Sequence, residues 1–291
     1  MSHFLLYVIG DNPGEQLEPF YECSEDNRYR EFVSTEEEYR EEWEKDKDKS
    51  VADYASFEEY MEGIGYDKDE ATGQYGYWTN PNGKWDWYSV GGRWTGFFRL
   101  KPDCDPENIM LGQSGAFRNT PEQSGEGLRS DQARKEAIDI EGMREECRKV
   151  AIEKYDKFEK IVEGIDPPTK TWEQTIDEFG EDNINQAQKA YNQHPWILAF
   201  RTSEMRSIWG DPVEKFFVYN GGRAAYVQHA VNQAFAPFAI LKDGQWYEKG
   251  KMCSFGMVAD EKEAEEWESQ VNTLIDGLPG DTLITVVDCH S

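Results

Sequence analysis

Three groups of residues in this sequence have the chemistry of a binding or catalytic site. The first surrounds one glycine pair and consists of Trp85, Asp86, Trp87, Arg93 and Trp94. An indole face stacks on planar ligands, and a guanidinium pairs with phosphate or carboxylate groups. This group therefore indicates a site for a nucleotide-like small molecule. The alternative is that the tryptophans are core residues and that Arg93 pairs with Asp86. It is favoured because aromatic residues at strand spacing are usually interior.

The second group is the segment Asn220-Gly221-Gly222-Arg223, which precedes a stretch with helical periodicity. The first N–H groups of a helix and the helix dipole attract anions. Gly221, Gly222 and Arg223 are therefore candidate anion-binding residues. The alternative is a simple helix cap in which the glycines supply backbone freedom.

The third group lies near the two ends of the chain and consists of His3, Asp288 and His290. Imidazole and carboxylate groups in one place bind transition metals or act as acid and base. Cys289 lies between two of them but points to the opposite face of a strand, so it is left out. The alternative is chance placement, which is favoured because the histidines are so few, four in all.

The common catalytic motifs are absent from the sequence. It contains no GxxxxGK[ST] phosphate loop, no HExxH zinc motif, no GxSxG nucleophile elbow and no GxGxxG at a strand-to-helix junction. The usual routes to nucleotide hydrolysis, zinc proteolysis and serine hydrolysis thus have no support. We predict no cofactor, and a protein without catalysis is favoured.

The charge and the cysteines limit the classes of partner and compartment. The chain has 58 acidic and 31 basic residues, a formal net charge of −27. General binding to nucleic acid backbones is excluded, because phosphate contacts need clustered Lys and Arg. The five cysteines form no CxxC pair, which suits reduced thiols in a cytosol. No stretch has the length of a signal peptide or a membrane span.

The hydrophobic pattern predicts an α+β fold. Strands are expected at residues 3–9, 238–241, 245–248 and 282–288, with a tight turn at Lys242-Asp243-Gly244. A further hairpin is expected around Gly91-Gly92, since adjacent glycines accept the positive φ of a two-residue turn. We predict a mostly antiparallel sheet that contains both terminal strands, with helices packed on it. Antiparallel terminal strands would place His3 beside His290.

The remaining segments are expected to be mainly helical. An acidic helix is predicted at residues 35–49, a long helix at 130–162 and shorter helices up to 195. Residues 216–219 have the pattern of a strand, and residues 101–130 that of a long irregular connection. The last helix is expected between Asp260, as N-cap, and Gly277. We predict one domain, 1–291, with a helical insertion at 130–195.

Several segments resemble an uncharacterised family of bacteriophage and prophage proteins. They are MSHF at the start, NPNGKWDWY at 80–88, GGRW at 91–94, DQARK at 131–135, KDGQWYE at 242–248 and TVVDCH at 285–290. The resemblance spans essentially the whole chain. It implies a phage accessory protein in the bacterial cytoplasm and assigns no activity or catalytic residue.

Two functions follow from these observations. The first is a non-catalytic protein that binds a host factor, such as a component of antiviral defence, through its acidic and aromatic surface. The alternative is a protein that binds or hydrolyses a nucleotide-like small molecule through the stretch from Trp85 to Trp94. Neither predicts an oligomeric state.

Overall fold

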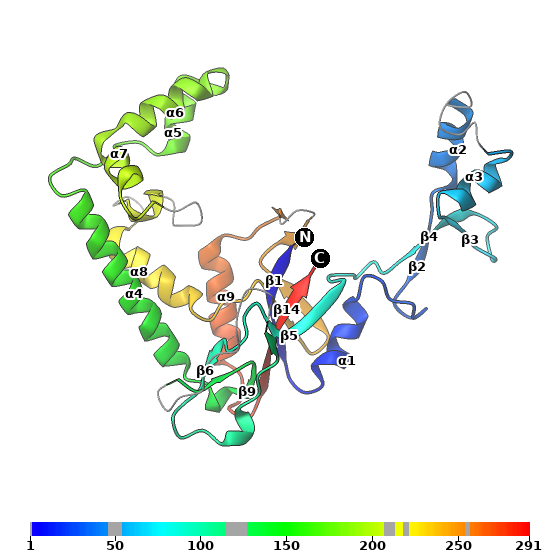
Figure 1. Ribbon diagram of the computed structural model, residues 1–291, viewed down its shortest axis with the longest axis horizontal. Helices are drawn as coiled ribbons and strands as arrows, with labels where there is room; N and C mark the ends of the chain where they lie inside the picture. The colour runs from blue at the N-terminus through cyan, green and yellow to red at the C-terminus, as the bar shows by residue number, and fades with distance from the viewer. Residues whose placement is uncertain (1, 46–53, 115–126, 207–212, 218–220, 254–256) are drawn as a thin grey trace. The chain divides into compact units, whose positions relative to one another are not determined.

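The computed structural model describes residues 2–45, 54–114, 127–206, 213–217, 221–253 and 257–291 (Figure 1). The chain forms two compact units. Unit 1 comprises Met1–Ile138, Pro237–Lys262 and Pro279–Ser291, and unit 2 comprises Asp139–Ala236 and Glu263–Leu278. Each unit is therefore built from segments that are distant in the sequence.

The main sheet of unit 1 has seven strands within the described residues, in the order β11-β10-β1-β14-β5-β7, with β9 also paired to β14. Figure 1 labels β1, β14, β5 and β9 of this sheet. The seven strands are β1 (His3–Ile9), β5 (Trp87–Gly92), β7 (Gln113–Ser114), β9 (Gln132–Arg134), β10 (Ala239–Lys242), β11 (Gln245–Glu248) and β14 (Leu283–His290). The pairs β1–β10 and β5–β7 are parallel. The α+β class is confirmed, but the expectation of a mostly antiparallel sheet holds only in part, because the sheet is mixed.

The central strands bring the two chain ends together, as expected. In the antiparallel pair β1–β14, His3 is opposite His290, and in β14–β5, His290 is opposite Trp87. Since alternate residues of a strand point to opposite faces, these three side chains share one face with Asp288. The other face buries an apolar cluster of Phe4, Leu6, Val8, Leu17, Trp85, Ala239, Leu241, Val287 and Cys289.

The predicted hairpin at β10–β11 is confirmed. Its two central residues, Asp243 and Gly244, have φ of 52° and 72°. Positive φ at both positions is the requirement of a type I′ turn, and Asp-Gly is a preferred pair for it. The strand β10 of this hairpin is the parallel partner of β1, so the hairpin continues the sheet on that side.

The hairpin predicted around Gly91-Gly92 is wrong. β5 pairs with β14 and β7, whereas β6 (Phe98–Arg99) pairs with β8 (Arg129–Ser130). The two glycines have φ of 78° and 54° and lead into a turn, where the Trp94 N–H donates to the Gly91 carbonyl at 2.9 Å. A Cβ on Gly91 would lie 2.3 Å from Asp131, and one on Gly92 would lie 2.4 Å from Asp288. The glycines are thus required by the close approach of two carboxylates.

A smaller sheet in unit 1 has its own core. It has the order β2-β4-β3, from β2 (Glu31–Ser34), β4 (Tyr75–Thr79) and β3 (Asp67–Lys68). Two helices contribute to the same hydrophobic cluster as this sheet. They are α2 (Glu36–Lys45), the predicted acidic helix, and α3 (Phe57–Gly63). The buried residues of this cluster are Phe57, Tyr60, Met61 and Tyr75.

The other short elements of unit 1 connect these sheets. They are α1 (Pro13–Leu17), η1 (Glu18–Phe20), η2 (Pro106–Asn108), η3 (Lys135–Ala137), and the strand pair β12 (Lys251–Met252) with β13 (Val258–Ala259). In the predicted irregular connection, residues 115–126 lie outside the described part of the chain.

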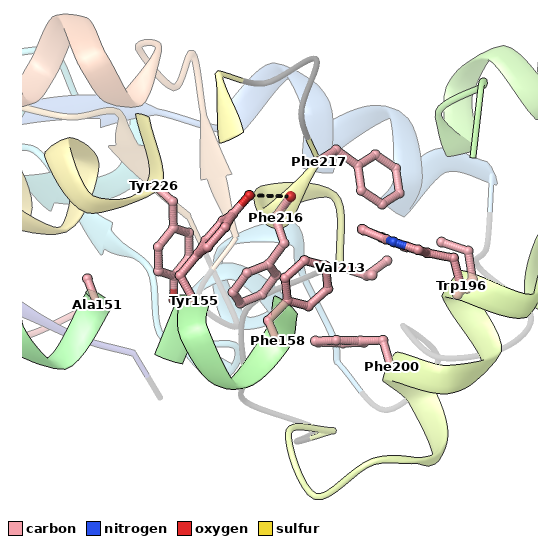
Figure 2. Packing of buried hydrophobic residues seen from close by; sticks show 10 residues of the cluster. Ala151, Tyr155, Phe158, Trp196, Phe200, Val213, Phe216, Phe217 and Tyr226 are labelled. Carbon is pink, nitrogen blue, oxygen red and sulfur yellow. Dashed lines mark hydrogen bonds between the residues drawn. The ribbon is translucent and has the colours of Figure 1, made fainter. Parts of the chain in front are cut away.

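Unit 2 is helical and is held by an aromatic core (Figure 2). It contains α4 (Ile140–Ile161), α5 (Trp172–Phe179), η4 (Glu181–Asn183), α6 (Ile184–Gln193), α7 (Pro195–Thr202), η5 (Val213–Phe216), α8 (Gly222–Gln233) and α9 (Ala264–Asp276). Phe158 stacks on Phe216 with ring centroids 4.5 Å apart, and the Tyr155 hydroxyl donates to the Phe216 carbonyl at 3.1 Å. Stacked rings with a satisfied hydroxyl stabilise a buried aromatic cluster.

Three helix and strand boundaries differ from the prediction. Residues 129–130 and 132–134 are the strands β8 and β9, so the long helix begins at Ile140 and not at 130. The predicted strand at 216–219 overlaps the end of η5, and residues 218–220 are outside the described part. Asp260 has a φ of 50° and does not cap α9, because the Lys262 N–H bonds the Lys249 carbonyl at 2.8 Å and keeps that segment out of the helix.

We predict that Gly92→Ala destabilises unit 1 far more than Gly73→Ala. Both glycines have positive φ, but a Cβ added at Gly73 would have nothing within 4 Å, whereas one added at Gly92 would contact Asp288. Backbone strain alone costs about 1–2 kcal/mol for Gly73→Ala. The steric overlap at Gly92 adds about 1–3 kcal/mol. Urea denaturation of the two variants measures the difference, and equal losses would contradict the role assigned to Gly92.

Candidate acid–base site

Two histidine–aspartate pairs lie on one face of the main sheet. His3 Nδ1 is 2.7 Å from Asp288 Oδ1, and His290 Nδ1 is 2.6 Å from Asp86 Oδ1. A carboxylate at Nδ1 orients the ring and favours the tautomer with the proton on Nδ1. Each pair therefore presents Nε2 as the nitrogen for acid or base chemistry.

The two imidazoles and Trp87 contact one another. The ring centroids of His3 and His290 are 5.1 Å apart, edge to face. Trp87 stacks on His290 at 5.3 Å with 13° between the planes, and it meets His3 edge-on at 5.2 Å. Trp87 is 44% exposed, so the indole also offers surface to a ligand.

His290 has a buried nitrogen without a hydrogen-bond partner. The side chain is 7% exposed, and Nε2 has no partner among the described residues. Buried polar atoms are normally hydrogen-bonded, and an unpaired one costs free energy. A ligand hydroxyl, amide or water at Nε2 would remove that cost.

Asp288 is fixed from both sides. Its side chain is 2% exposed, Oδ1 contacts His3, and Oδ2 accepts the backbone N–H of Arg93 at 2.8 Å. That N–H belongs to the turn that follows Gly92. The turn therefore sets the position of Asp288 and, through it, the orientation of the His3 ring.

A second buried carboxylate, Asp131, holds the same turn. It accepts the N–H of Gly96 at 2.5 Å, the N–H of Gly112 at 2.8 Å and the Thr95 hydroxyl at 3.1 Å. Burial raises the pKa of Asp131, and these hydrogen bonds lower it in part. All three of these contacting groups are hydrogen-bond donors. The position therefore favours Asp, which only accepts, over Asn, whose amide NH₂ would have no acceptor.

Glu22 adds a third acidic group near His290. Its backbone N–H donates to the Trp85 carbonyl at 2.9 Å, and the Asp86 N–H donates to the His290 carbonyl at 3.0 Å. Desolvation, followed by the negative charge of Asp86, raises the pKa of Glu22, while His290 lowers it. No motif or spacing in the sequence assigns Glu22 or Asp131 to this site.

The structure divides the first predicted group. Asp86 and Trp87 lie in the site, and Arg93 contributes its backbone N–H. Trp85 is a core residue: its Nε1–H donates to the Leu17 carbonyl at 3.3 Å and its ring stacks on Tyr21. Trp94 is half-buried in the turn after β5.

The second predicted group lies in unit 2. Gly221 and Gly222, with φ of 83° and 57°, lead into α8. The Arg223 guanidinium forms an ion pair with Asp156. The predicted anion site therefore belongs to a different unit from the histidine pairs, and its cation is already engaged by a carboxylate.

The third predicted group is brought together, but not as a metal centre. Within the part of the chain that the structure describes, no group of three or more His, Cys, Asp or Glu side chains is placed to hold a metal ion. In His3 and His290, Nδ1 bonds a carboxylate, a contact that is found both in acid–base pairs and behind metal-ligating histidines. The argument against metal binding by His3, Asp288 and His290 is therefore the lack of a suitable ligand group among the described residues.

Comparison with known proteins gives no relative. No protein-family model, no curated protein and no solved structure matches the chain. Within the described ranges, no helix has both the length and the apolar character to cross a bilayer.

We predict that Asp131→Asn lowers the free energy of unfolding by about 2–4 kcal/mol, because the amide NH₂ would face groups that only donate. Asp103→Asn is the control, since Asp103 is an exposed residue of the same unit. Urea denaturation gives both values. An Asp131→Asn variant as stable as Asp103→Asn would contradict the role of Asp131 in holding the turn.

Proposed function

We propose that the chain binds a nucleotide-like small molecule at the His3–His290 pair and acts on it by acid–base chemistry. One observation carries this proposal: His290 is oriented by Asp86, stacked on Trp87 and buried with Nε2 unpartnered among the described residues. Unpaired buried polar atoms are rare in folded proteins, so each one calls for an explanation such as a catalytic role. The site can therefore bind a group that completes the hydrogen bonding of His290.

The two histidines can have complementary roles. An imidazole with a carboxylate at Nδ1 accepts a proton at Nε2, and its conjugate acid returns one to a leaving group. His3 and His290 are adjacent and each has its own carboxylate, so one can act as base while the other acts as acid. Such proton transfer contributes about 10²–10⁴ in rate.

Trp87 provides the surface for a planar ring. Base-to-aromatic stacking contributes about 1–3 kcal/mol per base in nucleic acid binding proteins. Trp87 is 44% exposed and lies against both imidazoles. A ring stacked on Trp87 would place its substituents near the reactive nitrogens.

We predict that a nucleotide or nucleoside ligand raises the melting temperature of the protein and that Trp87→Ala removes the shift. A ligand at 100 times its Kd stabilises the folded state by about 2.7 kcal/mol. A thermal-shift panel of nucleosides, nucleotides, cyclic nucleotides and dinucleotides measures this, with product analysis by chromatography. His290→Asn should abolish turnover.

Trp78→Ala is the matched control for Trp87→Ala, because Trp78 is similarly exposed, at 40%, and lies on β4 of the smaller sheet. It should leave the shift unchanged. The proposal fails if no compound of the panel shifts the wild-type protein or is converted by it.

A second function is supported by a different surface. Trp78, on β4, is 40% exposed, and α2 of the same small sheet-and-helix group carries Glu36, Glu37 and Glu38 in its first turn. Tyr77 is 44% exposed but, as the preceding residue of the strand, lies on the opposite face. Exposed aromatic residues with a charged surround are typical of protein interfaces. We propose that the chain is a phage-encoded accessory protein of the bacterial cytoplasm and that it uses this surface to bind a basic host protein, such as a defence component.

We predict that the wild-type protein recovers a basic host protein in a pull-down and that Trp78→Ala reduces the recovery at least about fivefold. The reason is that exposed tryptophans at interfaces are often binding hot spots. Quantitative mass spectrometry of the bound fraction gives the ratio, with Trp87→Ala as the control. Equal recovery by the wild type and Trp78→Ala would contradict the role of this surface.

A further inference from the structure

Strand β2 (Glu31–Ser34) is an edge of the smaller sheet. In the order β2-β4-β3, it pairs with β4 and with no other strand that the structure describes. The N–H of Thr35, the next residue, donates to the Tyr75 carbonyl at 3.1 Å. Because the direction of the backbone groups alternates along an antiparallel pair, the N–H and C=O groups of Phe32 and Ser34 point away from β4.

The outward backbone groups of β2 can pair with another strand. Within the described ranges, no hydrogen bond joins the backbone of β2 to any segment other than β4. An edge with unpaired N–H and C=O groups accepts an extended segment from a second protein. The opposite edge is less suitable, since β3 has only two residues, the charged Asp67 and Lys68. Short and charged edge strands discourage such pairing.

One face of the smaller sheet carries Phe32 and Trp78. These residues are opposite each other in the β2–β4 register, and their ring centroids are 5.5 Å apart. Arg30 lies over the Trp78 ring at 4.7 Å, and Trp78 is 40% exposed. The buried Tyr75 lies on the other face, in the cluster to which α2 and α3 contribute. A partner side chain opposite Phe32 would therefore extend an exposed aromatic surface.

The segment that contains the smaller sheet is acidic. Residues 31–79 include sixteen Asp or Glu, five Lys or Arg and no histidine. Glu31 on β2 is exposed, as are Glu37 and Glu38 at the start of α2. A Lys or Arg directly opposite Glu31 on an added strand would form a favourable cross-strand pair.

We propose that β2 accepts an extended, basic segment of a partner protein as an additional antiparallel strand of the smaller sheet. The proposal rests on the second function above, host-protein binding, and specifies how the partner is bound. The partner residue opposite Phe32 is apolar and exchanges two backbone hydrogen bonds with it, and the residue opposite Glu31 is basic. The occupant is therefore a segment in which basic and apolar residues alternate.

A synthetic peptide tests the charge of the occupant. Fluorescein-labelled peptides with the sequences KVKVKV and EVEVEV are titrated with the full-length protein, and binding is followed by fluorescence anisotropy. We expect the basic peptide to bind with a Kd below about 1 mM and the acidic peptide to bind at least about tenfold more weakly.

N-methylation separates strand addition from binding by charge alone. In an antiparallel pair with a valine opposite Phe32, the valine N–H groups of the peptide face β2 and the lysine N–H groups face away. The peptide N-methylated at its three valines should therefore lose measurable binding. The peptide N-methylated at its three lysines has the same charge and composition, and it should bind within about threefold of the parent.

Ser34→Pro tests the same contact from the side of the protein. Proline removes the outward N–H, and its ring blocks an added strand, but it is tolerated on an edge strand whose N–H faces away from the sheet. Ser34→Ala is the matched control, because it changes only the side chain. We expect Ser34→Pro to weaken the basic peptide at least about tenfold and Ser34→Ala to leave its affinity unchanged. Circular dichroism shows whether both variants are folded, and if Ser34→Pro is not, the N-methylated peptides decide.

The outcomes separate this inference from the second proposed function. Strand addition is wrong if KVKVKV does not bind, if the two N-methylated peptides bind equally, or if folded Ser34→Pro binds as tightly as Ser34→Ala. If Trp78→Ala nevertheless reduces recovery of a basic host protein, that function stands without strand addition. If the peptides behave as expected but the wild-type protein recovers no host protein, strand addition stands and the host partner is wrong. If both sets of experiments fail, both proposals are wrong.

Discussion

The close approach of a glycine turn to two buried carboxylates is the constraint on which the site depends. Gly91 and Gly92 leave no room for a Cβ beside Asp131 and Asp288, and the N–H groups that follow them bond both carboxylates. Buried carboxylates are tolerated only when donors surround them. These bonds connect the turn to the segment that contains Gly112, through Asp131, and to the last strand, through Asp288. The pairing of the strands forms the sheet, and these hydrogen bonds fix the positions of the polar side chains on one of its faces.

This constraint has a direct consequence for the histidines. Asp288 is held by the turn on one oxygen, so its other oxygen is available in a fixed position for His3. The pairing of β1, β14 and β5 then places His290 and Trp87 in the same row. The outcome is two imidazoles with separate carboxylates, one half-exposed indole and one unpartnered buried nitrogen among the described residues. The proposed function, acid–base chemistry on a stacked ligand, uses all of these features.

The sequence predicted the terminal strands and the proximity of His3 and His290, because continuous apolar runs and an Asp-Gly turn are local signals. It did not predict the histidine–aspartate pairs. Asp86 and His290 are separated by 204 positions, and only the register of β5 on β14 brings them together. The glycine pair was misassigned because glycine serves equally for a hairpin turn and for close packing. The contacts of Asp131 and Glu22 had no local signal, since one acidic residue in a polar stretch resembles any other.

The central claim is that aspartates hold His3 and His290 with Nδ1 protonated and leave the buried Nε2 of His290 without a hydrogen-bond partner among the described residues. Nitrogen-15 NMR of the imidazole rings, assigned by substitution of each of the four histidines, tests it most directly. The structure predicts the Nδ1–H tautomer for the neutral forms of both rings, and a loss of this tautomer for His290 alone in Asp86→Asn. An Nε2–H tautomer for His290 in the wild-type protein, unchanged by Asp86→Asn, would contradict the claim.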